Sequence, residues 1–184
     1  MKMKDKKLDE LIPNEYVKDI HAIDYERLYS LGKKLILFDL DNTLADYDTP
    51  DASKKLVTLF DAIKKRGSTI LILSNNSHKR VRRFAHQLEV KGIYRLGKPA
   101  TRKIKKYLKS MNYTFDEMVW IGDQIITDVR CAKKLNIYAI LVDPIKPQSE
   151  RWYTKINRLL ENDALKKIKE RRGNLYNSLK LNER

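Results

Sequence analysis

The sequence has few of the features that mark secreted or membrane-embedded proteins. It holds one cysteine, Cys131, so no disulfide can form within the chain, and a reducing cytosol is expected. The longest apolar runs, near Leu35–Phe38 and Ile70–Leu73, are far shorter than the roughly 20 residues that span a bilayer. No apolar segment follows residues 1–7, so no secretory signal is expected. The composition predicts a globular, cytoplasmic protein without a transmembrane segment.

Acidic residues are also scarce relative to basic ones. The net charge is +15, and residues 34–110 carry 18 basic against 7 acidic side chains. One interpretation is that the basic residues are ordinary solvated helix faces. The other is a phosphate-rich partner, such as nucleic acid, an anionic lipid or a polyphosphorylated solute. Charge alone favours the first interpretation, and the clustering gives some weight to the second.

Short apolar runs alternate with segments of helical periodicity along most of the chain. We expect five buried strands, at residues 34–39, 69–73, 93–96, 117–121 and 138–142. A helix is expected over Ala52–Arg66, with Asp51 as its cap, and another from about Thr127 to Leu135. Alternation of this kind predicts an α/β fold with a mostly parallel five-stranded sheet and helices on both faces.

The domain organisation follows from the same pattern. Residues 1–33 are expected to form a helical extension packed on the domain, and residues 34–148 the core. Residues 149–184 read as a basic helix whose last dozen residues form a polar tail. No internal repeat is visible.

Polar residues stand where successive strands are predicted to end. Asp39, Ser74, Lys98 and Asp123 each lie at the carboxyl end of a strand or just past it, and Asp41 should share the face of Asp39. Each has an ordinary explanation as a helix cap, a turn former or a surface lysine. Ligands of parallel sheets, however, bind beyond the carboxyl ends of the strands. We therefore expect these side chains to converge in one crevice.

Such a crevice has a definite chemistry. The carboxylates of Asp39 and Asp123 would bind a hard cation such as Mg²⁺, which relieves their mutual repulsion and keeps Asp39 ionised. A phosphate would bridge the cation, Ser74 and Lys98. A calcium loop is excluded, because its sixth position would be Leu44 rather than Gly. Phosphoryl transfer needs mainly positioning and charge neutralisation, which this set supplies.

Four ordered motifs resemble the haloacid dehalogenase (HAD) superfamily of phosphatases, whose fold is a Rossmannoid three-layer sandwich. The motifs are Asp39-Leu40-Asp41-Asn42-Thr43, Ser74-Asn75-Asn76, Lys98-Pro99, and Gly122-Asp123 with Asp128. More narrowly, Leu11-Ile12-Pro13 and the run Gly122–Val129 resemble the subfamily IIIA phosphatases of the YqeG type. Mitochondrial relatives of this subfamily dephosphorylate phosphatidylglycerophosphate. The resemblance covers roughly residues 8–165 and departs at Cys131, where glycine is expected and where we infer a packing role.

The resemblance implies catalytic and metal-binding roles. Asp39 would attack phosphorus and become an aspartyl-phosphate. Asp41 would act as general acid and then general base, and its backbone carbonyl would bind Mg²⁺. Asp39 and Asp123 would supply the remaining metal-binding carboxylates. Asp128 would orient Lys98 or the metal site from behind.

It also implies the residues that hold the phosphoryl group. Ser74 and Lys98 would bind its oxygens, Asn75 would add backbone or amide contacts, and Thr43 would order the loop after the first strand. Cap domains of selective members lie between these motifs, yet Asp39 and Ser74 are only 35 positions apart, and Ser74 and Lys98 only 24. We therefore expect no cap domain and an open site.

An open site suits a phosphate on something large or embedded in a surface, and phosphatidylglycerophosphate is the first candidate. Basic segments near Arg80–Arg83 and Arg102–Lys109 would face an anionic membrane, placing the protein on its inner face, and Trp152, Tyr153 and Ile156 would anchor there or pack on the domain. Two alternatives stay open: a phosphatase of nucleotides or nucleic-acid ends, and a basic RNA- or ribosome-binding module with an idle site. Nucleic acid is less favoured, because no basic platform interleaved with aromatics is present. The sequence indicates no oligomeric state.

Overall fold

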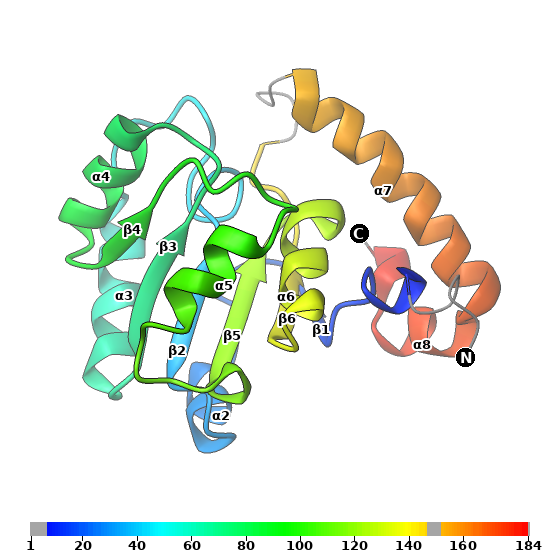
Figure 1. Ribbon diagram of the computed structural model, residues 1–184, viewed down its shortest axis with the longest axis horizontal. Coiled ribbons are helices and arrows are strands. Elements are labelled where there is room, and N and C mark those ends of the chain that lie inside the picture. The colour runs from blue at the N-terminus through cyan, green and yellow to red at the C-terminus, as the bar shows by residue number, and fades with distance from the viewer. Residues whose placement is uncertain (1–6, 147–151, 184) are drawn as a thin grey trace.

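A six-stranded sheet forms the centre of the molecule (Figure 1). The computed structural model describes residues 7–146 and 152–183. The strand order is β1-β6-β5-β2-β3-β4, and all neighbouring strands are parallel. The strands are β1 (Glu15–Val17), β2 (Leu35–Phe38), β3 (Thr69–Leu73), β4 (Lys91–Ile93), β5 (Met118–Gly122) and β6 (Tyr138–Val142). The parallel sheet expected from the sequence is confirmed, although the prediction of five strands was one too low.

The additional strand, β1, lies in the segment that was expected to be helical. It pairs with β6, with Tyr16 opposite Leu141, and forms the edge of the sheet. Three residues are too few to show an alternating pattern, so periodicity could not predict this strand. Its pairing covers what would otherwise be an open edge of β6. β1 thereby joins the N-terminal segment to the sheet.

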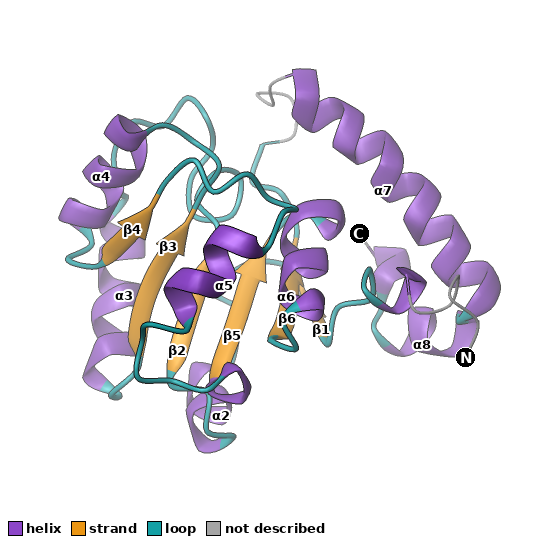
Figure 2. Ribbon diagram, in the orientation of Figure 1, coloured by secondary structure: helices purple, strands orange, loops and turns teal. Residues whose placement is uncertain are grey.

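Helices cover both faces of the sheet (Figure 2). One core contains apolar residues of α2 (Tyr25–Ser30), α3 (Lys54–Lys65) and α4 (His78–Gln87). The opposite core contains residues of α5 (Arg102–Leu108), α6 (Arg130–Lys134) and α7 (Trp152–Arg171). Cys131 is fully buried in this second core, where burial raises the pKa of its thiol to about 12. The three-layer arrangement with helices on both sides is confirmed.

The connections between strands are short. α3 is the helix between β2 and β3, and α4 is the helix between β3 and β4, so no cap domain is inserted at either place. The cap of α3 is Ser53, whose Oγ accepts a hydrogen bond from Leu56 N at 3.1 Å. Asp51, the expected cap, instead accepts two hydrogen bonds from Arg83, both at 2.7 Å.

The sequence left open whether the C-terminal tail is ordered. In the structure, residues 173–178 form α8 (Gly173–Ser178), and a 3₁₀ turn follows at Leu181–Glu183. Tyr176 and Leu181 are buried. Two apolar residues among many polar ones are too few to show the periodicity that predicts a helix. α7 runs along the side of the domain away from α3 and α4 (Figure 1). No helix in the described ranges is long and apolar enough to span a membrane.

The side chains of Trp152, Tyr153 and Ile156 lie outside the described residues, as does the expected boundary between residues 148 and 149.

Candidate active site

The carboxyl end of β2 is the point where the chain changes direction across the sheet. From β2 the chain moves outward to β3 and β4, and then returns to the other side of β2 as β5. Open α/β sheets bind ligands at such a switch point, because the loops there diverge. Asp39, Ser74 and Asp123 directly follow β2, β3 and β5. The topology therefore gathers these residues at one edge.

Four charged side chains meet there and are termed the inner cluster: Asp39, Lys98, Asp123 and Asp128. Lys98 Nζ donates to Asp39 Oδ1 at 2.5 Å, to Asp128 Oδ1 at 2.6 Å and to the carbonyl of Leu73 at 3.1 Å. All four residues are buried, with Lys98 7% exposed and Asp123 fully covered. Water therefore has little access to these charges, and the Lys98 ammonium offsets only part of the negative charge of the three acids.

Burial dominates the protonation of this cluster. It raises the pKa of Asp39 well above its usual range, and the carboxylates of Asp128, Asp123 and Asp41 raise it further, against the opposing effect of Lys98. Burial alone would lower the pKa of Lys98, but the carboxylates of Asp128 and Asp39 outweigh it and raise that pKa. Lys98 is thus held firmly in its ammonium form.

The inner cluster has the composition of a divalent-metal site. Oxygen atoms of Asp39, Asp123 and Asp128 lie within 4.8 Å of one another, so these residues could hold a metal ion. Three carboxylates against one ammonium leave an excess of two negative charges when all are ionised. Hard oxygen ligands and a charge deficit of two fit Mg²⁺ or a similar cation.

Gly122 is required for Asp128 to enter the cluster. A Cβ at this position would lie 2.4 Å from Cγ of Asp128, a distance that no side chain tolerates. Asp128 belongs to a π-helical turn, η2 (Ile125–Val129), and its Oδ2 accepts a hydrogen bond from Gln124 N at 3.3 Å. The missing side chain of Gly122 and this turn together place the Asp128 carboxylate against Lys98.

A second set of side chains, the outer cluster, surrounds Asp41 and comprises Asp41, Ser74, Asn76 and Arg80. Asp41 Oδ1 accepts from Arg80 Nε at 2.6 Å. Asp41 Oδ2 accepts from Asn76 Nδ2 at 2.9 Å and from Ser74 Oγ at 3.3 Å. The chain turns immediately afterwards, with φ of +65° at Asn42 and a bridge between Asp41 and Ala45. Among the described residues, the Asp41 carboxylate does not belong to the metal-holding group.

Comparison with known proteins identifies the family. A curated relative from Bacillus subtilis (strain 168), named "Probable phosphatase YqeG", is 35% identical over 164 residues, which are 89% of this chain and 94% of the relative. The chain belongs to the YqeG-type phosphatases of the HAD superfamily. The family model of haloacid dehalogenase-like hydrolases matches residues 47–136, a range that begins after Asp39 and Asp41.

Two further similarities are more distant. A phosphatidylglycerophosphate phosphatase 1, chloroplastic/mitochondrial, from Arabidopsis thaliana is 27% identical over 168 residues, and the match spans 85% of this chain but only 48% of that protein. A solved structure of an uncharacterized protein from Listeria monocytogenes serotype 4b has a TM-score of 0.51 at 17% identity, covering 64% of this chain and 85% of that one. The latter likeness concerns the fold alone.

Two other expected site residues of this HAD phosphatase, Thr43 and Asn75, form hydrogen bonds that hold other site residues in position. Thr43 Oγ1 donates to Asp123 Oδ1 at 3.1 Å, which links the loop after β2 to the loop after β5. The Asn75 side chain bonds the backbone of Lys98 in both directions, donating to its carbonyl at 3.1 Å and accepting from its N–H at 2.7 Å. The Asn75 amide group therefore helps to hold the Lys98 backbone in place.

Sequence reasoning missed two residues of the phosphatase site. Arg80 was placed in the basic segment Arg80–Arg83, which was expected to face an anionic membrane, yet it points inward to Asp41. Its position four residues before the buried Phe84 was the available signal, because residues four apart share a helix face, and the guanidinium carbon lies 5.1 Å from that ring centre. Glu161 of α7 is buried and accepts a hydrogen bond from Ile125 N at the start of η2. Glu161 is one of three acidic residues among the basic side chains of α7, and its position carried no such signal.

Proposed function

We propose that this phosphatase hydrolyses phosphomonoesters with Mg²⁺, through an aspartyl-phosphate formed on Asp39. The observation that carries the proposal is the inner cluster: a buried carboxylate at the switch point, 2.5 Å from a buried lysine, with two further acids beside it. Asp39, Asp123 and the backbone carbonyl of Asp41 would hold the metal, and Asp128 is close enough to contribute. When bound, the cation supplies positive charge that offsets the charge on the phosphoryl oxygens.

In the first step, a carboxylate oxygen of Asp39 attacks phosphorus. The bond from phosphorus to the ester oxygen breaks, and its electron pair goes to that oxygen, which takes a proton from Asp41 and leaves as an alcohol. Ser74 Oγ and Lys98 Nζ would hold the phosphoryl oxygens during the transfer. Asp39 becomes an acyl phosphate, and Asp41 becomes a carboxylate.

In the second step, water attacks the phosphorus of the acyl phosphate and gives a proton to Asp41. The bond from phosphorus to the Asp39 oxygen breaks, which releases inorganic phosphate and restores both acids to their starting states. The two aspartates need opposite protonation states. They lie in different clusters, so a cation held by the inner cluster would favour ionised Asp39 without contacting the Asp41 carboxyl group.

The surroundings of the site support a large or surface-bound substrate. Within residues 7–146 and 152–183, no cap domain covers the carboxyl edge of the sheet. Exposed cations lie at this edge, in the first turns of α4 and α5 and in the loop after β4, without an ion-pair partner within the described residues: Lys79, Arg95, Arg102 and Lys103. Nearby acids are neutralised, with Asp48 bonded to Lys146 and Asp51 to Arg83. The edge therefore carries a surplus of positive charge.

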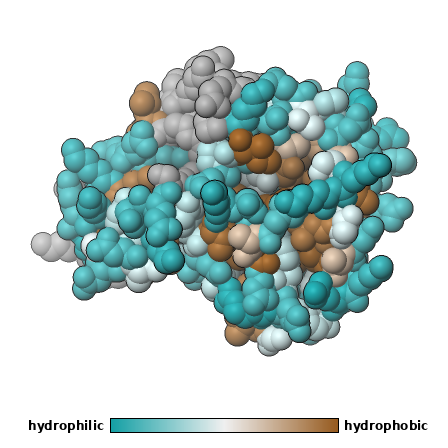
Figure 3. All heavy atoms as spheres, turned by 180° about the vertical axis from the view of Figure 1, so that it is seen from behind, coloured by the Kyte–Doolittle hydropathy of each residue, from teal (hydrophilic) through white to brown (hydrophobic). Residues whose placement is uncertain are grey.

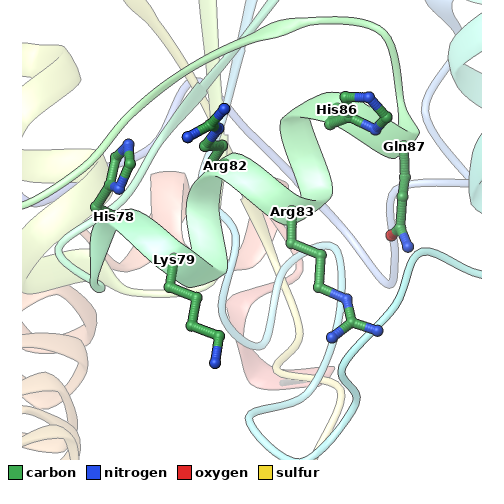
Figure 4. A pocket seen from close by; sticks show the side chains of 6 residues that line it. All are labelled: His78, Lys79, Arg82, Arg83, His86 and Gln87. Carbon is green, nitrogen blue, oxygen red and sulfur yellow. The ribbon is translucent and has the colours of Figure 1, made fainter.

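The outer surface of α4 extends this charge. A hollow of about 480 Å³ beside it is lined by His78, Lys79, Arg82, Arg83, His86 and Gln87 (Figure 4). The reverse side of the molecule is mostly hydrophilic, with apolar atoms in separate patches (Figure 3). Attraction to an anionic membrane would thus be mainly electrostatic. Since one relative is named as a phosphatidylglycerophosphate phosphatase, that lipid is the first substrate proposed, with the protein peripheral on the inner face of the membrane.

A phosphate-release panel tests this function. It compares phosphatidylglycerophosphate in vesicles, nucleotides, sugar phosphates and 3′-phosphorylated RNA, each with Mg²⁺ and with chelator, and uses Asp39→Asn as the inactive control. We expect Mg²⁺-dependent release that is fastest from the lipid. Preference for nucleotides or RNA ends would overturn the substrate, and equal release by the Asp39→Asn variant would overturn the mechanism.

Vesicle sedimentation tests the membrane contact separately. We expect retention on vesicles containing phosphatidylglycerol that falls as salt rises, because surface charges are screened. Arg102→Glu with Lys103→Glu should abolish retention. As a control, Lys65→Glu with Arg66→Glu makes the same charge change at the far end of α3. This variant should still bind the vesicles. Equal retention on neutral vesicles at high salt would contradict electrostatic docking.

A further inference from the structure

Arg80 makes three hydrogen bonds at the edge of the active site, and none of them is needed for helix formation. Its Nε donates to Asp41 Oδ1 at 2.6 Å, its Nη1 to the carbonyl of Thr49 at 2.8 Å, and its Nη2 to the carbonyl of Asp46 at 2.6 Å. We propose that Arg80 is a positioning residue that fixes the Asp41 carboxyl group and confines its transferable proton to Oδ2. This inference rests on the proposed function of Asp41 as general acid.

The three contacts fix the orientation of the Arg80 guanidinium group. Each of its three nitrogens donates a hydrogen bond to the loop after β2, and its central carbon lies over the Phe84 ring. The Arg80 side chain is 15% exposed. A planar fork held in this way restricts rotation of the carboxylate that it binds. Arg80 is therefore directed at Asp41 and the loop rather than at an incoming phosphate.

The location of the proton follows from the donors around Asp41. A guanidinium stays protonated and has no acceptor, so a proton on the oxygen that it bonds would oppose one of its N–H groups. Oδ1 is that oxygen. Oδ2 instead faces Ser74 Oγ and Asn76 Nδ2, of which the Ser74 hydroxyl can rotate to accept. Oδ2 is also the oxygen of Asp41 that contacts Ser74, which is proposed to bind the phosphoryl group.

A purely structural role for Arg80 predicts a different result. If Arg80 only anchored the loop through Asp46 and Thr49, its removal would slow all substrates alike. If it acts through Asp41, its removal should harm substrates in proportion to their need for a general acid. An alkyl phosphate needs protonation of its leaving oxygen, whereas p-nitrophenyl phosphate leaves as a stable phenolate and needs little.

The experiment compares kcat/KM of Arg80→Met for glycerol phosphate and for p-nitrophenyl phosphate. This ratio reports steps up to formation of the phosphoenzyme, so the later hydrolysis does not enter. We expect a loss of about 100-fold with the alkyl phosphate and less than about fivefold with the aryl phosphate. Lys65→Met, which removes an exposed charge at the far end of α3, should change neither value.

A double-mutant cycle separates this inference from the proposed function. Asp41→Asn should show the same substrate dependence, and adding Arg80→Met to it should cost little more, because both act on one proton transfer. Equal losses on both substrates for Arg80→Met, or full additivity with Asp41→Asn, would overturn the role of Arg80. If Asp41→Asn itself shows no substrate dependence, the general-acid assignment fails instead. If Arg80→Met does not fold, Arg80→Lys replaces it, because lysine keeps the charge but cannot make the three hydrogen bonds together. The test is then the loss of kcat/KM in Arg80→Lys on the alkyl phosphate compared with its loss on the aryl phosphate.

Discussion

Two aspartates only two positions apart occupy contrasting surroundings in this protein. Asp39, in the inner cluster, is buried with two other acids and one lysine, and water has little access to it. Asp41, in the outer cluster, is bonded by an arginine, an amide and a hydroxyl. The same side chain is therefore placed once among excess negative charge and once among donors. Position in the fold, not residue type, would thus separate the proposed nucleophile from the proposed acid.

The contrast also concerns what each cluster lacks. The inner cluster has more negative than positive charge and fits a divalent cation. The outer cluster contains one acidic side chain, Asp41, and one basic side chain, Arg80, so its charges balance without a bound ion. Changes in the inner cluster should therefore affect metal binding and stability together, whereas changes in the outer cluster should affect proton transfer.

The largest expected difference is in catalysis. Asp39→Asn should reduce phosphate release with Mg²⁺ by at least about 10³-fold, because the nucleophile is lost, and Asp41→Asn by about 10²-fold. Calorimetric titration with Mg²⁺ should show weakened binding for Asp39→Asn and nearly unchanged binding for Asp41→Asn. Loss of metal binding in Asp41→Asn would erase the distinction between the clusters.

The next difference is in stability. Lys98→Met leaves three buried carboxylates without their ammonium and should lower the free energy of unfolding by about 3–5 kcal/mol in chelator. Arg80→Met should cost less, since the outer cluster is closer to water. Urea denaturation measures both values, and added Mg²⁺ should restore part of the Lys98→Met loss. A larger loss for Arg80→Met than for Lys98→Met would show that the inner charges are not the more strongly coupled set.

A smaller effect is expected from α7, which supports the inner cluster from behind. Glu161→Gln keeps an acceptor for Ile125 N but removes the charge, and should destabilise the protein by about 1–2 kcal/mol. Since η2 carries Asp128, Mg²⁺ affinity should fall about tenfold. Glu170→Gln, exposed on the same helix, should leave the melting temperature and the affinity unchanged. Equal behaviour of the two variants would exclude a supporting role for Glu161.

The smallest effect is a pH dependence in the absence of metal. The raised pKa of Asp39 means that its ionised form opposes folding, so this contribution weakens stability as pH rises from about 4 through the folded-state pKa. In chelator, Asp39→Asn should therefore melt about 1–3 °C higher than the wild type at neutral pH. Below about pH 4 the two proteins should melt together. A wild type that is the more stable at neutral pH would show that Lys98 outweighs burial.

Much of the fold was readable in the chain. The runs that became β2, β3, β5 and β6 are short, apolar and bounded by polar residues, and a parallel sheet with helices on both sides follows from their alternation. β1 and α8 were not readable, because each depends on two or three apolar residues that gain their stability from packing on a distant element.

The approach of Asp39, Lys98 and Asp123 was also readable, since each follows a strand of one parallel sheet and such ends share an edge. The sequence thereby determined which chemical groups meet and that acids outnumber the lysine among them. The tertiary structure alone decided how they divide, with Asp128 against Lys98 and Arg80 against Asp41. The physical reason is that the positions of residues along a strand are set by local backbone geometry. Ion pairs between separate loops instead depend on where a turn, a missing Cβ or an inward-facing helical residue directs each side chain.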